Sequence, residues 1–378
     1  MPALVIFVLS AAYVGYVLCG YPLVVALLAR WRARPVRRGR YEPPVSALLP
    51  VHNGEQWIAA KLDSLLALNY PHDRLQIIVI SDGSTDRTEE IVMRYAPRGI
   101  ELIQLPRGGK ALALNAGLKR ATGEVLFLTD VRQPLDADSL RNLTACLADP
   151  TVGAVSGELV MFDDNTQEKA NVGLYWRYEK WIRRRLSQID SVLGATGAIY
   201  VIRRSLAQPM PPNMLLDDVY LPLCAFFAGR RVVFEETAIA YDRAAALETE
   251  FRRKVRTLAG VYQIVKYFPQ LVSFQNRMWF DFISHKLGRL FLPYALIALA
   301  LSSFWIPAPW WKIAVALQGM FYALAAMDRI LPDSLPLKRL SSPARTFVVL
   351  VAAALCAVAI FFVPTRSLWK GAAEKAAA

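Results

Sequence analysis

A stretch without charged side chains, residues 3–29, limits what this chain can fold into more than any other feature. It is longer than the roughly 20 apolar residues that cross the hydrocarbon core of a bilayer. It lacks a basic start and an obvious small-residue cleavage site, which disfavours a removed signal peptide. Six arginines follow within residues 30–40. By the positive-inside rule they place the N-terminus outside and the following chain in the cytoplasm.

Three more apolar segments lie near the other end of the chain, at residues 290–306, 313–327 and 346–363. The first and third have the length and composition of membrane spans. The second is shorter and contains Gln318. The basic link at 328–345 is expected inside. We therefore predict four spans, with the C-terminus outside, although the basic residues of the tail favour the opposite side.

The charge and the cysteines narrow the class of protein further. The net charge is +13, which suits nucleic acid, anionic lipid or an anionic substrate. Basic residues gather beside the first apolar stretch and in an amphipathic pattern at 173–189, so we expect a lipid surface and no nucleic acid. The four cysteines are isolated and form no metal cluster or disulfide framework, which suits a reducing cytoplasmic face.

Residues 42–249 have the pattern of an α/β domain, in which short apolar runs alternate with helical segments. Strands are predicted at 45–53, 75–84, 100–106 and 123–130, and helices at 54–68, 85–96 and 110–121. In such sheets ligands bind beyond the carboxyl ends of the strands.

Polar and turn-forming residues follow all four predicted strands: Pro50, His52 and Asn53, residues 81–84, residues 107–110, and Asp130. They predict a cleft. No G-x-G-x-x-G follows the first strand and no Walker loop is present, which argues against a dinucleotide or P-loop site. Carboxylates and one lysine suit a nucleotide recognised through its base and ribose, with its diphosphate held by a metal and a cation.

Seven motifs occur in order between residues 45 and 263: "PVHNGE", "ISDGSTDRT", "GGKALALNAGL", "FLTDVRQ", "GATGAIYVIRR", "LLDDVYLPLCAFFAGRRVVFEETAIAYD" and "EFRRKVRTLAG". With them the chain resembles a family 2 glycosyltransferase, with a Rossmann-like GT-A fold flanked by membrane spans. The arrangement is similar to the membrane synthases of hyaluronan, chitin oligomers and poly-N-acetylglucosamine. The resemblance implies a nucleotide sugar donor, most often UDP-linked, a divalent metal (Mg²⁺ or Mn²⁺) and inversion at the anomeric carbon.

The resemblance also assigns a nucleotide-sugar site. Asp82 matches the acid that contacts the base or ribose, although an Asx turn before Gly83 would also use an aspartate. Glu55 matches an acidic position facing the nucleoside, and as a helix-start acid it would equally be stabilised by the dipole. Lys110 matches the lysine near the diphosphate. Pro50, His52 and Asn53 belong to the same predicted site.

Asp218 is the predicted catalytic base, and Asp217 stands where an acid often precedes that base. Because a sugar hydroxyl is a poor nucleophile, direct displacement needs a group that takes its proton. The alternative is that the two acids cap the helix that follows and ends at Gly229. Gly194 and Gly197 match the glycine-rich segment that lines the sugar and acceptor pocket.

Asp130 matches the metal ligand, but the second acid of an Asp-x-Asp pair is replaced by Arg132. One carboxylate, the substrate diphosphate and water form a reasonable shell for Mg²⁺. Arg132 cannot bind a metal. It can reach phosphate or an anionic sugar substituent, or pair with a nearby acid. Asp136 and Asp138 are expected to begin the next helix rather than to replace the missing ligand.

The segment "EFRRKVRTLAG" departs from the Gln-x-x-Arg-Trp motif of processive synthases. Arg256 matches the arginine, which implies a contact to the leaving diphosphate; Arg253 replaces the glutamine and Thr257 the tryptophan. That tryptophan lines the acceptor site beneath a growing polymer, so its absence favours a lipid or glycan acceptor that receives a small addition. The alternatives are a processive polysaccharide synthase and, with Arg132 in mind, a non-catalytic nucleotide-binding scaffold.

The chain is thus predicted to be a multi-pass protein of a bacterial-type inner membrane with a cytoplasmic catalytic domain. The predicted parts are an N-terminal span (1–30), a basic linker (31–41), the GT-A domain (42–249), interfacial helices (250–289), three C-terminal spans (290–365) and a tail (366–378).

Overall fold

The computed structural model describes residues 2–162, 174–243, 247–332 and 335–364. Its contacts divide the chain into two units. One, the α/β unit, comprises residues 31–171 and 183–244. The other, the helical unit, comprises residues 1–30, 172–182 and 245–378. Helix α7 (Leu174–Ile189) contributes to both.

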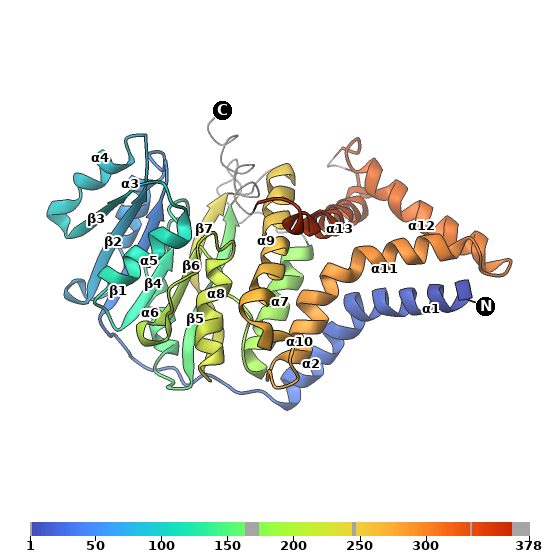
Figure 1. The fold of residues 1–378 in the computed structure, drawn as a ribbon, viewed down its shortest axis with the longest axis horizontal. Helices are drawn as coiled ribbons and strands as arrows, with labels where there is room; N and C mark the ends of the chain where they lie inside the picture. Colours follow the sequence, from blue (N-terminus) through green and yellow to red (C-terminus); the bar gives the residue numbers. More distant parts are fainter. Residues whose placement is uncertain (1, 163–173, 244–246, 333–334, 365–378) are drawn as a thin grey trace. The chain divides into compact units, whose positions relative to one another are not determined.

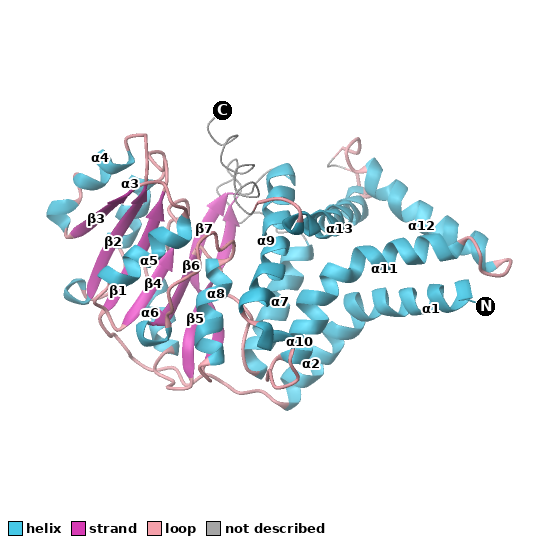
Figure 2. Ribbon diagram, in the orientation of Figure 1, coloured by secondary structure: helices cyan, strands magenta, loops and turns pink. Residues whose placement is uncertain are grey.

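The α/β unit is built on one seven-stranded sheet of order β3-β2-β1-β4-β6-β5-β7 (Figure 2). The first four strands are β1 (Val45–Val51), β2 (Leu75–Asp82), β3 (Ile100–Leu105) and β4 (Val125–Thr129). They pair in parallel, and β1 and β4 are buried along almost their whole length. Continuous apolar runs are typical of parallel strands covered on both faces, which is why the sequence located these four.

The other half of the sheet mixes directions. β6 (Ile199–Arg203) pairs antiparallel with both β4 and β5 (Val152–Phe162), while β5 pairs in parallel with β7 (Arg231–Arg243). The sheet is therefore mixed.

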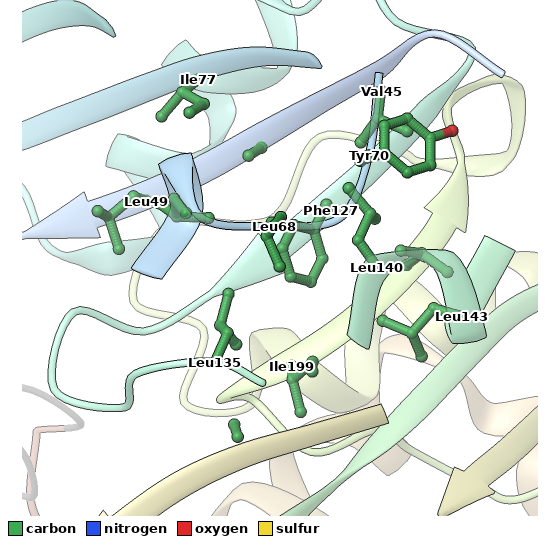
Figure 3. Packing of buried hydrophobic residues seen from close by; sticks show 14 of the residues in the cluster. Val45, Leu49, Leu68, Tyr70, Ile77, Phe127, Leu135, Leu140, Leu143 and Ile199 are labelled. Atoms are coloured by element: carbon green, nitrogen blue, oxygen red, sulfur yellow. The ribbon is translucent and has the colours of Figure 1, made fainter. Parts of the chain in front are cut away.

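Helices cover both faces of the sheet. α3 (Ile58–Leu66) and α6 (Ser139–Cys146) pack on one face, where Leu49, Phe127 and Ile199 join the main hydrophobic core (Figure 3). The short α4 (Thr88–Met93) contacts α3, β2 and β3. α5 (Lys110–Arg120) and α8 (Asp217–Phe227) lie on the opposite face (Figure 1). Gly117 lets α5 approach closely, since a Cβ there would lie 3.0 Å from Cδ1 of Ile80.

The basic linker is attached to the surface of the α/β unit. Arg34 pairs with Asp190 at 3.3 Å, and Arg38 pairs with the buried Glu235. The amide of Gly39 donates to the carbonyl of Ala145 at 3.2 Å. At least two of the arginines predicted to face the membrane are therefore paired with acids of the domain.

The helical unit comprises α1 (Pro2–Gly15), α2 (Tyr21–Trp31), α9 (Leu247–Tyr267), α10 (Trp279–Asp281), α11 (Gly288–Ser303), α12 (Trp310–Met327) and α13 (Lys338–Cys356). Among the described residues, three helical stretches are long and apolar enough to cross a membrane: Pro2–Trp31, Trp279–Ser303 and Lys338–Phe361. α12, which contains the shortest predicted span, is not among them. The four-span topology stays a prediction.

Two tyrosine hydroxyls of the first apolar stretch are hydrogen-bonded within the helical unit. The Tyr13 hydroxyl donates to the carbonyl of Gly288 at 3.0 Å, and the Tyr21 hydroxyl donates to Asp281 at 3.0 Å. These bonds join the first apolar stretch to the one that begins at Trp279.

Candidate active site

The segments that follow β1 and β2 interlock, because parallel strands end at the same edge of a sheet. Nδ1 of His52 donates to the carbonyl of Asp82 at 2.9 Å. Asn53 has a positive φ of 50°, and its side-chain oxygen accepts from the amide of Thr85 at 2.8 Å. Pro50 lies in β1, in register with Ile80. The structure thus brings together residues that were predicted to border the nucleoside.

Asp82, predicted to contact the nucleoside, is buried at the end of β2 and organises a loop. Its carboxylate accepts from the amides of Gly108 at 2.7 Å and Gly109 at 2.9 Å, and pairs with Arg107. A Cβ at Gly83 would lie 2.7 Å from the amide of Arg107, so the two loops touch. Asp82 therefore holds the loop that leads directly into Lys110.

Glu55 is engaged with the segment before α4. Its amide donates to Asp86 at 3.0 Å, and its carboxylate accepts from the amide of Arg87 at 3.1 Å. Asp86 also accepts from the amide of Thr88 at 3.0 Å, as expected for an acid at a helix start. These contacts join Glu55 to the segment before α4. Its predicted role at the start of the helix that follows it, and its predicted nucleoside contact, stay predictions.

A second group of charged residues meets around Lys110, the first residue of α5. Its ammonium lies 2.8 Å from Asp130, which follows β4, and 3.0 Å from Asp217, the first residue of α8. Burial would lower the pKa of Lys110, but Asp130 and Asp217 raise it above its ordinary value, so the ammonium stays charged. Leu216 occupies the N-cap position of α8, so neither Asp217 nor Asp218 is the capping residue of this helix.

Gly194 and Gly197 lie against the start of α8. A Cβ at Gly197 would lie 3.2 Å from Oδ2 of Asp218 and 3.6 Å from Oδ2 of Asp130, so the glycine leaves room for both carboxylates. Gly194 has a φ of 135°, which disfavours any other residue. The amide of Ala195 donates to the carbonyl of Asp218 at 2.6 Å. The predicted base and the predicted metal ligand therefore flank the same glycine.

Of the alternatives predicted for Arg132, the structure shows the one in which it pairs with an acid. Its guanidinium lies 2.9 Å from the buried carboxylate of Asp242 on β7, and the Gln133 amide nitrogen donates to the same carboxylate at 2.8 Å. Its predicted contact with the donor stays a prediction.

No group of three or more His, Cys, Asp or Glu side chains able to hold a metal ion occurs in the described part of the chain. The oxygens of Asp130 and Asp218 nevertheless face one glycine, and a cation, the Lys110 ammonium, already lies between Asp130 and Asp217. Oxygen donors suit Mg²⁺ or Mn²⁺, and the shell would have to be completed by substrate.

Two charged residues of this site were not predicted from the sequence. Asp242 belongs to the last strand, far along the chain. Lys61 is 1% exposed on α3 and donates to Oγ1 of Thr129, next to Asp130. A signal for Lys61 was present: it falls one helical turn from Leu65 and from Trp57, on the apolar face of the predicted helix.

Arg253 and Arg256 lie on α9, in the helical unit. Arg253 pairs with Glu250 at 2.6 Å and lies over the ring of Trp176, 5.7 Å from its centroid. The contact of Arg256 with the leaving diphosphate and the place of Arg253 in the nucleotide-sugar site stay predictions.

Residues 46–210 match the model of glycosyl transferase family 2. The chain is 27% identical over 257 residues to a probable glycosyltransferase, YdaM, of Bacillus subtilis, covering 63% of this chain and 60% of the relative. It is 26% identical over 299 residues to an N-acetylglucosaminyltransferase of Rhizobium sp., covering 72% and 65%. The chain thus spans less than two thirds of the length of both relatives.

Two further similarities complete the comparison. The chain is 23% identical over 307 residues to the beta-monoglucosyldiacylglycerol synthase of Synechocystis sp., covering 75% of this chain and 63% of the relative. Its fold resembles that of the mannosyltransferase PcManGT from Pyrobaculum calidifontis, solved with GDP-Man and Mn²⁺, with a TM-score of 0.73, 24% identity and coverage of 93% and 97%. Residues 46–210 are therefore similar to the family 2 glycosyltransferases, and the fold is that of a solved glycosyltransferase.

Substitution of Gly197 by alanine tests the packing of the two carboxylates. We expect about a 10- to 100-fold loss of transfer, because the new methyl group would push on Asp218 and a small misplacement of reacting groups is costly. Initial rates of sugar transfer measure the effect. Gly39→Ala is the matched control, since a Cβ there meets only the Cβ of Ala148, at 3.4 Å. Equal rates for wild type and Gly197→Ala would contradict the proposed crowding.

Proposed function

We propose that this protein is an inverting membrane glycosyltransferase. It transfers a hexosyl unit from a nucleotide sugar, UDP-linked, to a hydroxyl of a lipid or glycan acceptor at the cytoplasmic face of a bacterial-type inner membrane. The observation that carries the proposal is the meeting of Lys110, Asp130 and Asp217 at the strand ends of a family 2 domain, with Gly197 between Asp130 and Asp218.

In the proposed reaction, Asp218 accepts the proton of the acceptor hydroxyl as its oxygen attacks the anomeric carbon. The bond from that carbon to the diphosphate oxygen breaks on the opposite face, and the nucleoside diphosphate leaves with the bonding electrons. One displacement inverts the configuration. A positioned carboxylate base typically contributes 10²–10⁴-fold to such a rate.

The donor is held by the interlocked segments after β1 and β2. In the proposal, residues 50–55 and Asp82 border the nucleoside, and Lys110 donates to the diphosphate. Mg²⁺ or Mn²⁺ would be held by Asp130 and by diphosphate oxygens, and when bound it would neutralise charge on the leaving group. Gly194 and Gly197 would leave room for the sugar and acceptor.

A membrane acceptor is supported by the three apolar helical stretches and by the similarity to a diacylglycerol glycolipid synthase. Thr257, in place of the tryptophan of processive synthases, favours a short addition over a long polymer. Processive synthesis is the second candidate.

Purified full-length protein in detergent tests the function. It is incubated with a panel of UDP- and GDP-linked sugars, Mn²⁺, and either diacylglycerol or oligosaccharide acceptors, and products are identified by mass spectrometry. A product one sugar heavier than an acceptor is expected, and a ladder of long products would indicate processive synthesis. Nucleotide binding with no turnover across the panel would overturn the proposal in favour of the scaffold.

The proposed metal ligand has its own test, the substitution Asp130→Ala. Because Asp130 is the only protein oxygen assigned to the metal, we expect at least a tenfold higher Mn²⁺ requirement, measured by titrating Mn²⁺ at saturating donor. Asp136→Ala, in the following segment, is the control. An unchanged Mn²⁺ dependence in Asp130→Ala would remove Asp130 from the metal site.

A further inference from the structure

Lys61 is a charged residue in the hydrophobic layer beneath the strand end that carries Asp130. It is 1% exposed, and its helical neighbours Ile58, Leu62 and Leu65 are fully buried in the core. Its Nζ donates to Oγ1 of Thr129 at 2.6 Å and to the carbonyl of Gln133 at 2.5 Å. One ammonium thus binds the chain on both sides of Asp130.

The network continues from these two contacts. Oγ1 of Thr129 donates to the carbonyl of Ala198 at 2.7 Å, next to Gly197. The side chain of Gln133 donates to Asp242 at 2.8 Å. Residues 129–133 are therefore fixed from α3, from the glycine-rich segment and from β7, while the carboxylate of Asp130 remains directed to Lys110.

Packing alone does not account for a lysine at this position. Burial lowers the pKa of Lys61 to about 7, which reflects the cost of a charge in the core. An apolar side chain would fill the space beside Leu62 without that cost, but it could not donate to Thr129 or Gln133. The hydrogen bonds therefore distinguish Lys61 from its neighbours on the helix.

We propose that Lys61 is a positioning residue that fixes the strand end carrying Asp130 and so sets how tightly the metal–diphosphate group of the donor is bound. The inference rests on the proposed function through the role of Asp130. It predicts that loss of the Lys61 hydrogen bonds weakens metal binding more than loss of an equally buried apolar side chain does. Partners of metal ligands typically contribute 10- to 100-fold to metal affinity.

The experiment compares Lys61→Met with Leu62→Ala, a core substitution at the adjacent buried position. Mn²⁺ binding to the full-length protein is measured by electron paramagnetic resonance with UDP present, and hydrogen exchange of the peptide over 129–133 by mass spectrometry. Thr129→Val, which removes one acceptor of Lys61, is the second variant if Lys61→Met does not fold. Donor KM and kcat are measured at saturating Mn²⁺.

We expect Lys61→Met to weaken Mn²⁺ binding about tenfold and to raise exchange at 129–133, with kcat at saturating Mn²⁺ changed less than the Mn²⁺ affinity. Leu62→Ala should lower the melting temperature and leave Mn²⁺ affinity within about twofold. Unchanged Mn²⁺ affinity in Lys61→Met, or an equal loss in Leu62→Ala, would overturn the inference. If wild type binds no Mn²⁺ with UDP, the metal part of the proposed function fails, and exchange at 129–133 alone decides whether Lys61 fixes this segment.

Discussion

Replacing Asp218 by asparagine lowers the rate of sugar transfer about 10³-fold, the largest effect that we expect from a single substitution. Asparagine keeps the size of the side chain and its position beside Gly197, but it cannot take the proton of the acceptor hydroxyl. The donor is held mainly by other residues, so nucleotide affinity should change by less than about threefold. Single-turnover transfer rates and equilibrium nucleotide binding separate the two quantities.

The control for this variant is Asp73→Asn, an exposed aspartate in the segment before β2. It should keep the wild-type rate, which excludes a general effect of removing one negative charge. Asp217→Asn is informative beside it: because Asp217 pairs with Lys110, its loss should act mainly on donor KM. If Asp218→Asn transferred sugar at the wild-type rate while Asp217→Asn did not, the base would be Asp217.

The fold could be predicted as far as local patterns reach. The first four strands are apolar on both faces and alternate with helices, so β1 to β4 and α5 lie close to where the sequence placed them. β6 runs antiparallel between β4 and β5, and β5 pairs with the distant β7. Such pairings depend on tertiary packing between segments far apart in the chain, which periodicity does not report.

The site, like the fold, could be predicted from the sequence only in part. Strand ends in a parallel sheet must meet, so the grouping of His52, Asn53 and Asp82 followed from topology. The ion-pair and hydrogen-bond partners of the site residues did not follow from topology. Asp242, which pairs with Arg132, lies on β7, and Asp82 accepts hydrogen bonds from the loop before Lys110. These pairings join residues from different elements, and residue types alone left several partners possible for each.

Lys110→Met should change metal binding and donor binding in opposite directions. The ammonium lies within 3.0 Å of both Asp130 and Asp217, so a metal ion approaching the free protein competes with it for Asp130. Without the ammonium, Mn²⁺ should bind the nucleotide-free protein at least about threefold more tightly. The donor loses a point charge for its diphosphate, and its KM should rise by about 100-fold.

Lys119→Met, an exposed lysine in the last turn of the same helix, is the matched control, and it should alter neither quantity. Mn²⁺ binding is followed by electron paramagnetic resonance without nucleotide, and donor KM by transfer rates at saturating Mn²⁺. Weaker Mn²⁺ binding in Lys110→Met would mean that the lysine supports the metal site rather than competing for it. An unchanged donor KM would mean that Lys110 remains with its two carboxylates during the reaction, so that the diphosphate charge is met by other groups.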